Sequence, residues 1–160
     1  GHSDPINSVA VTADARWAIS GSGDKTVGLW DLDRLTLLRK LHGQDGYVYA
    51  VGLSADGRYA VSGGYDAVVR VWDLASNTEC QKLLGHDDCI DCVLVTHDAR
   101  NVVSGSRDQT VKVWDLVSGQ NLATFTADDA ITALVAADNG LFVAGSANGA
   151  IHILKLIHGL

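Results

Sequence analysis

The sequence predicts an all-β fold built from four consecutive units of short antiparallel strands, and three observations lead to this prediction. A Ser/Gly-rich turn followed by an apolar stretch occurs three times, ending at Trp30-Asp31, Trp72-Asp73 and Trp114-Asp115. The three tryptophans are 42 residues apart each time. The chain contains 17 glycines and a single proline, which is typical of short strands joined by tight turns. A fixed period of roughly 40–45 residues that ends in Trp-Asp is typical of four-stranded β-propeller blades.

Apolar runs separated by turn signals divide the first three units into strands. In the first unit, residues 1–42, we expect strands at 6–11, 17–22, 26–31 and 36–41. In the second unit, residues 43–84, we expect strands at 47–53, 58–62, 67–73 and 79–84. In the third unit, residues 85–126, we expect strands at 89–95, 101–104, 110–115 and 121–125.

The fourth unit, residues 127–160, keeps the strand pattern and loses the polar positions. It aligns with the third unit at an offset of 40, which places Leu134-Val135 at the positions of Leu94-Val95. The replacements are Ala144 for Ser104, Asn148 for Asp108 and Leu154 for Trp114. Only residues 157–160 follow its third strand, so we expect the last blade to lack its outer strand.

These repeated segments resemble the WD40 repeat (WD-repeat) family of β-propellers, and the resemblance covers nearly the whole chain. The resemblance implies a partial ring, because the family usually builds roughly seven blades and propellers span about 4–8. An unclosed stack would expose two blade faces and unpaired strand edges. We therefore expect the chain to form about half of a larger propeller, its C-terminal part, or to pair with a second copy in an eight-bladed ring.

The same resemblance implies a hydrogen-bonded network of His, Ser, Asp and Trp in each complete unit. A buried Trp N–H and a buried Ser hydroxyl need partners, and a His can bridge the Ser to the Asp. The expected members are His2, Ser20, Asp24 and Trp30, then Ser62, Asp66 and Trp72, then His86, Ser104, Asp108 and Trp114. In the second unit Gln44 stands at the His position, and His42 could replace it only through a shifted loop. We expect the third unit to be the most stable and the fourth to depend on its neighbours.

Three patterns could point to an enzyme, and each has a structural explanation. Ser, His and Asp form hydrolase triads, but an active site is seldom duplicated at a fixed period with an added Trp. The segment 21–26 resembles the end of a phosphate loop, yet Asp24 stands where that motif needs Gly. Cys89 and Cys92 are spaced as C-x-x-C, but residues three apart on a strand point to opposite faces. We expect no enzymatic activity, no cofactor and no metal, and we expect the three cysteines to be buried free thiols.

Composition limits the kinds of partner and the cellular compartment that we expect for this protein. The chain carries 19 acidic and 12 basic residues, a net charge of −7, which opposes a nucleic-acid-binding surface. No apolar run approaches the ~18 residues of a membrane span, so we expect no membrane partner. We recognise no signal peptide, and the odd number of cysteines forms no disulfide framework. A reducing, cytoplasmic location is the expectation.

The His-to-Asp bond should place the loop before each first strand and the turn before each third strand on one rim. The exposed residues expected there are Ser3, Asp4, Asp45, Tyr47, Tyr65, Asp88, Arg107, Gln109 and Asp129. Tyr and Arg are enriched among the energetic anchors of interfaces. We therefore predict that Tyr47, Tyr65 and Arg107, with Asp45 and Asp88, contact a protein or peptide, a basic one in view of the surrounding aspartates.

The predicted function is a non-enzymatic protein-interaction scaffold that presents this rim to its partners. One alternative is a regulatory or sensor propeller within a larger multidomain signalling ATPase, whose catalytic part would lie outside this chain. A second alternative is a hydrolase, for which the sequence offers no supporting constellation.

Overall fold

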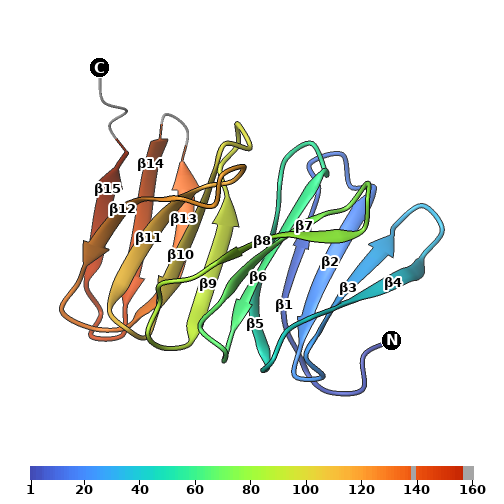
Figure 1. The fold of residues 1–160 in the computed structure, drawn as a ribbon, viewed down its shortest axis with the longest axis horizontal. Coiled ribbons are helices and arrows are strands. Elements are labelled where there is room, and N and C mark those ends of the chain that lie inside the picture. The colour runs from blue at the N-terminus through green and yellow to red at the C-terminus, as the bar shows by residue number, and fades with distance from the viewer. Residues whose placement is uncertain (138–139, 157–160) are drawn as a thin grey trace.

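The computed structural model describes residues 1–137 and 140–156 and consists of four antiparallel sheets arranged side by side in chain order (Figure 1). Blade 1 contains β1 (Ile6–Val11), β2 (Trp17–Ser22), β3 (Thr26–Asp31) and β4 (Thr36–His42). Blade 2 contains β5 (Val48–Leu53), β6 (Tyr59–Gly64), β7 (Val69–Asp73) and β8 (Thr78–Leu83). Blade 3 contains β9 (Ile90–Val95), β10 (Asn101–Ser106), β11 (Thr110–Asp115) and β12 (Asn121–Thr126).

Blade 4 has three strands within the described residues, β13 (Ile131–Ala137), β14 (Leu141–Ser146) and β15 (Ile151–Lys155). Three four-stranded sheets followed by a three-stranded sheet confirm the predicted fold class. The expectation that residues 157–160 are too few to form a further strand concerns residues outside the described part of the chain.

Consecutive blades meet through their first strands, because β1 contacts β5, β5 contacts β9 and β9 contacts β13. A separate apolar cluster fills each of the three contacts between blades. Strands between two such clusters are buried on both faces, as β10 shows along its whole length. This explains why the inner strands lack the alternation of apolar and polar residues that a sheet with one solvated face would have.

The hairpin between the first two strands carries a register shift near the same rim in every blade. Beyond the shift, Val48 still pairs with Gly64, and Ile90 with Ser106. The second strands therefore extend to Gly64 and Ser106, two residues past the ends predicted from the apolar runs.

One predicted equivalence in blade 4 is wrong. Leu134 pairs with Ala144 in the way that Val93 pairs with Ser104. Leu134 therefore corresponds to Val93, 41 positions earlier, and not to Leu94. The cause is the chain between the paired residues Ala136 and Phe142, which is one residue shorter than the chain between the equivalent pair, Val95 and Val102.

Blade 1 has an uncovered face. Ile6 is 52% exposed, whereas the residues at its position in the later blades, Val48, Ile90 and Ile131, are fully buried. A groove of about 360 Å³ lies on this face beside Ile6 and Trp30. Blades 2, 3 and 4 bury this same face against the preceding blade. Blade 1 therefore exposes one half of an inter-blade contact.

Blade 4 has the complementary uncovered face. Ile151 is 73% exposed, whereas Val27, Val69 and Val111 at the same position in blades 1, 2 and 3 are at most 2% exposed. Ile153, two residues further along β15, is equally exposed. Each earlier blade buries this same face against the following blade. Blade 4 therefore exposes the other half of an inter-blade contact.

Candidate functional site

Blade 3 contains a closed network around a buried histidine. His86 Nδ1 lies 2.7 Å from Asp108 Oδ2, and Nε2 lies 2.8 Å from Ser104 Oγ. Trp114 Nε1 donates to the same Ser104 oxygen at 2.8 Å. Because a carboxylate only accepts, Nδ1 carries the hydrogen, and Nε2 accepts the hydroxyl hydrogen of Ser104. Every polar atom of the Ser–His pair is thereby satisfied in a site closed to water.

Blade 1 carries the same network with one addition. His2 bridges Asp24 and Ser20 at 2.9 and 2.7 Å, and Trp30 donates to Ser20 Oγ at 2.8 Å. Lys40 Nζ also donates to Asp24, at 2.8 Å. Burial acts to raise the pKa of Asp24, but hydrogen bonds led by that from Lys40 outweigh burial and hold the pKa well below its usual range.

Blade 2 replaces the histidine with a different pair. The side-chain amide of Gln44 donates to Ser62 Oγ, which also accepts from Trp72 Nε1 at 2.9 Å. Arg70 Nη1 donates to Gln44 Oε1 at 2.7 Å and to Asp66 at 2.6 Å. His42 ends β4 in an exposed position, so it does not take the place of the missing histidine.

Sequence reasoning missed Arg70, whose side chain is 1% exposed and also pairs with Asp45 and Glu79. Arg70 stands on β7 at the position that Gly28 and Lys112 occupy in the neighbouring blades. The sequence could have indicated this role, because Arg70 stands on a strand expected to be buried on both faces. A buried charge of this kind needs carboxylate partners.

The blade 3 network should make folding sensitive to acid. Burial lowers the pKa of His86 from its ordinary 6.5, because loss of hydration outweighs the attraction of Asp108. Burial acts to raise the pKa of Asp108, but hydrogen bonds from Thr110 and His86 lower it to about 2. Both pKa values are lower in the folded chain than in the unfolded chain, so the unfolded chain binds more protons. Stability should therefore fall below about pH 6.5 through His86 and again below about pH 4 through Asp108.

Combining His86→Gln with Lys112→Arg gives blade 3 the pair that blade 2 carries. We expect this variant to lose the acid dependence between about pH 6.5 and 4.5 while its stability at neutral pH stays within about 1 kcal/mol of the parent. Urea midpoints measured across this pH range would show the change. His97→Gln, at an exposed histidine, is the control and should keep the parental slope. A double variant with the parental slope would contradict the assignment to His86.

The structure brings two of the predicted contact residues together on the rim. Tyr47 lies in the loop before β5 and Tyr65 in the turn after β6, joined by the Tyr65 N–H donating to the Tyr47 carbonyl at 2.9 Å. Their ring centroids are 6.3 Å apart, and the two residues are 52% and 63% exposed. Tyr49, which the sequence reasoning did not include, extends the cluster with its ring 6.5 Å from Tyr47.

Arg107 lies on the same rim but is held in place by two residues that the prediction missed. Its Nε lies 2.9 Å from Asp91, and its guanidinium lies 5.4 Å from the centroid of the Tyr49 ring. Tyr49 and Asp91 occupy the same position on β5 and β9, 42 residues apart. The sequence could have indicated Tyr49 and Asp91, because both stand at the same repeat position at the rim end of a first strand.

The two predicted aspartates have separate surroundings. The Asp45 side chain is 87% exposed, and its carboxylate lies 3.3 Å from Arg70 Nη2. Asp88 is exposed, with its carboxylate accepting from the Cys89 N–H at 2.6 Å. Asp45 therefore borders the tyrosine pair of blade 2, whereas Asp88 belongs to the entry loop of blade 3.

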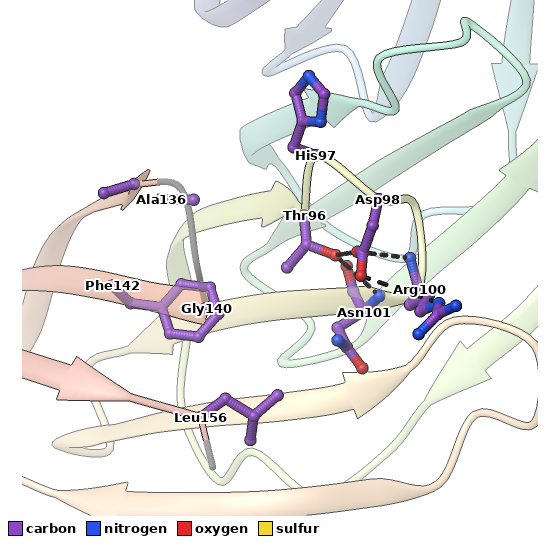
Figure 2. Close-up of a pocket in the computed structure, with 10 residues that line it drawn as sticks. Thr96, His97, Asp98, Arg100, Asn101, Ala136, Gly140, Phe142 and Leu156 are labelled. Atoms are coloured by element: carbon purple, nitrogen blue, oxygen red, sulfur yellow. Dashed lines mark hydrogen bonds and ion pairs between the residues drawn. The ribbon is translucent and has the colours of Figure 1, made fainter. Parts of the chain in front are cut away.

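The opposite rim has a pocket of about 500 Å³ between the first hairpins of blades 3 and 4. Figure 2 shows Phe142 and Leu156 on one side of it and the Thr96–Asp98–Arg100 turn on the other. Asp98 already accepts from the Thr96 hydroxyl at 2.7 Å and from the Arg100 N–H at 3.1 Å. Blades 1 and 2 form the same bonds in their own hairpins, at Thr12–Asp14–Arg16 and Ser54–Asp56–Arg58. These polar groups thus stabilise a recurring turn and do not converge on a ligand.

Ser104, His86 and Asp108 have the contacts of a hydrolase triad, but their burial removes the chemistry. Ser104 is completely buried, and its oxygen already accepts the Trp114 N–H. A nucleophile must be reachable by a substrate carbonyl, and this one is enclosed between two blades. In residues 1–137 and 140–156, no three His, Cys, Asp or Glu side chains are placed to hold a metal ion. In the same residues, no helix is long and apolar enough to cross a membrane.

The three cysteines are free thiols with different exposures. Cys89 is buried and Cys92 half-buried, and burial raises the pKa of Cys92 to about 12. The expectation that all three are buried is wrong for Cys80, which is exposed. Cys80 lies on β8, the outer strand of its blade, where one face meets solvent.

Comparisons with known proteins agree with this architecture. The sequence profile described as "WD domain, G-beta repeat" matches residues 1–31, 35–73 and 77–115. A segment of 51 residues, 32% of the chain, is 47% identical to a "Probable E3 ubiquitin ligase complex SCF subunit sconB" of Emericella nidulans, and 43% identical to scon-2 of Neurospora crassa, described in the same words. The match spans 8% of the length of each of these two proteins.

Two solved structures share the fold. A structure of U3-55K and a crystal structure of the RRP9 WD40 repeats each superpose with a TM-score of 0.92 at 24% identity. Each superposition covers 98% of this chain, and 50% and 49% of those chains, respectively. The four blades thus have the arrangement of about half of a known WD40 protein.

Proposed function

The chain belongs to the WD40 repeat family, and on that premise we propose that it is a non-enzymatic scaffold that binds a protein or peptide at the rim. The polar residues that could have formed an active site are buried in the networks that hold the blades. The fungal proteins that the chain resembles are named as subunits of a ligase complex, which supports a role in assembly.

The exposed aromatic cluster on the rim of blades 2 and 3 carries this proposal. Tyr47 and Tyr65 stand largely in solvent as an adjacent pair, and tyrosine is enriched at protein interfaces. Arg107 stands beside them, held by Asp91 and Tyr49. Ordered aromatic and arginine side chains lose little conformational entropy on binding, which is the property of interface anchors.

Replacing Tyr65 and Arg107 together with alanine should weaken the binding of a partner at least about 10-fold. The partner would first be isolated by affinity enrichment with the chain as bait, and its affinity would then be measured by titration. The control is the double replacement of Arg58 and Arg100 with alanine, since both are exposed on the opposite rim. Unchanged affinity in the rim variant would remove this surface from consideration.

We also propose that units 1–42, 43–84, 85–126 and 127–160 each supply one blade of a larger ring. The remaining blades would come from a longer parent chain or from a second copy. The support is the pair of uncovered faces, since the residues exposed on them are buried at the same positions in the other blades. Exposed apolar faces of this kind mark surfaces that another part of an assembly covers.

Light scattering on the isolated chain tests this proposal. We expect self-association, which replacement of Ile151 and Ile153 with glutamate should abolish, because two carboxylates would have to be buried in each contact. Glutamate at Leu84 and Val117, which are exposed outside these faces, should leave association unchanged. A well-behaved monomer of the unsubstituted 160-residue chain would contradict both forms of ring completion.

We propose a cytoplasmic location for the protein. The three cysteines are free, and one of them is exposed to solvent. Free exposed thiols persist in reducing compartments and tend to be oxidised elsewhere.

A further inference from the structure

Blade 2 departs from its neighbours at four positions that surround one point on the rim. The turn residue Tyr65 corresponds to Gly23 and Arg107, and the loop residue Tyr47 corresponds to Pro5 and Cys89, because the same backbone hydrogen bond joins each pair. One residue before each of these, blade 2 has Gly46 and Gly64, where blades 1 and 3 have Asp and Ser. All four replacements are therefore local to one loop and one turn.

The two glycines let the tyrosines approach each other. A Cβ atom on Gly46 would lie 2.8 Å from Tyr65 Cβ and 3.0 Å from its ring carbon Cδ1. A Cβ atom on Gly64 would meet the Tyr47 carbonyl oxygen. In blade 3 the equivalent serine donates instead to a loop carbonyl, Ser106 Oγ to Asp88 O at 2.9 Å. Blade 2 gives up that hydrogen bond, and the loop and the turn close on each other.

The result is a pocket of about 300 Å³ lined by Lys25, Asp45, Gly46, Tyr47 and Tyr65. The two rings are inclined at 58° with centroids 6.3 Å apart. Asp45 adds an exposed carboxylate, one oxygen of which lies 3.3 Å from Arg70 Nη2, and its backbone N–H donates to Asp66 at 3.0 Å, which fixes the loop. Lys25, from the turn of blade 1, is a cation in the lining of the pocket.

We propose that this pocket binds the lysine or arginine side chain of a basic peptide, with the cation against the exposed ring faces of Tyr47 and Tyr65 and beside Asp45. The faces of tyrosine rings attract cations, and a carboxylate adds to that attraction. The surrounding rim is acidic, with exposed carboxylates at Asp4, Asp87, Asp88 and Asp128. This inference rests on the proposed function and names the chemistry of its partner. Lys25 opposes the ligand, so its removal should strengthen binding.

The test uses the 160-residue chain with carbon-13-labelled tyrosine rings, titrated by nuclear magnetic resonance. The probes are three short Gly-Ser peptides that carry two arginines, two citrullines or two glutamates. We expect the arginine peptide to shift the Tyr47 and Tyr65 signals and to bind about 3- to 10-fold more tightly than the citrulline peptide. Equal binding of these two peptides, or tighter binding of the glutamate peptide through Lys25, would overturn the proposal.

Variants separate ring chemistry from shape. Tyr65→Phe keeps the ring face and should keep the affinity within about 2-fold, whereas Tyr65→Leu should lose at least about 3-fold. Lys25→Ala should strengthen binding about 2-fold. If Tyr65→Leu binds as well as Tyr65→Phe, the cation site is overturned. The scaffold proposal would survive that result, provided that the captured partner still depends on Tyr65 and Arg107.

Discussion

Valine at Gly63 is expected to lower the free energy of unfolding by about 3 kcal/mol or more, whereas valine at Gly145 should leave it nearly unchanged. A Cβ atom on Gly63 would lie 2.6 Å from Ile90 Cγ2 and 3.0 Å from Ile90 Cβ, across the contact between blades 2 and 3. Neither the strand nor the branched side chain can move away without separating the two blades. At the same position in blade 4, the nearest atom to Gly145 is Ala133 Cβ at 3.7 Å.

Gly63 and Gly145 occupy equivalent repeat positions near the end of the second strand of their blades. Each substitution is therefore a matched control for the other. Valine has a higher strand propensity than glycine, so Gly145→Val could stabilise the chain by up to about 1 kcal/mol. Urea unfolding at a protein concentration where the chain is monomeric would measure both. Equal losses at the two positions would contradict the explanation from close approach of neighbouring blades.

Ser104→Ala is expected to destabilise the chain by about 2–4 kcal/mol. Its oxygen is the common partner of Trp114 Nε1 and His86 Nε2 in a fully buried site. Alanine would leave two buried polar groups unsatisfied, at about 1–3 kcal/mol each. The lost volume is small, so hydrogen bonding accounts for most of the effect.

A double-mutant cycle isolates this effect. Trp114→Phe removes the indole donor, and the cycle with Ser104→Ala should show a coupling of about 1–2 kcal/mol. Ser76→Ala, at an exposed hydroxyl that pairs with Thr78, should change stability by less than about 0.5 kcal/mol. Purely additive losses in the cycle would mean that the Trp–Ser hydrogen bond does not contribute as the geometry indicates.

The repeat pattern was sufficient to predict the blades, and the resemblance to the WD40 family led us to expect the network of His, Ser, Asp and Trp. Arg70 escaped prediction because its partners Gln44, Asp66 and Glu79 come together only when β7 lies between the loop and the neighbouring strand. Arg107 was predicted to contact a partner, but the sequence did not indicate that Asp91 and Tyr49 hold its side chain in place. Such contacts depend on which side chains face each other across two blades, and the spacing of one repeat does not contain that information.

The shortened hairpin of blade 4 was missed for a related reason. A one-residue deletion in the hairpin of β13 and β14 leaves an apolar pattern that fits either alignment, since Leu134 and Val135 are both apolar. Only the pairing of Leu134 with Ala144 distinguishes the two. Strand register is weakly specified where neighbouring residues are alike in size and polarity.

The two uncovered faces are unlike halves of a single contact, so copies of the isolated chain that associate through them would join head to tail. Head-to-tail association builds filaments of unlimited length unless the rotation from each copy to the next brings the last tail back to the first head. Closing a ring joins two ends of the same assembly, whereas extending a filament requires another copy of the protein. Dilution therefore favours closed rings, and high concentration favours open filaments. The isolated chain should therefore be most soluble when refolded at low concentration, before any step that concentrates it.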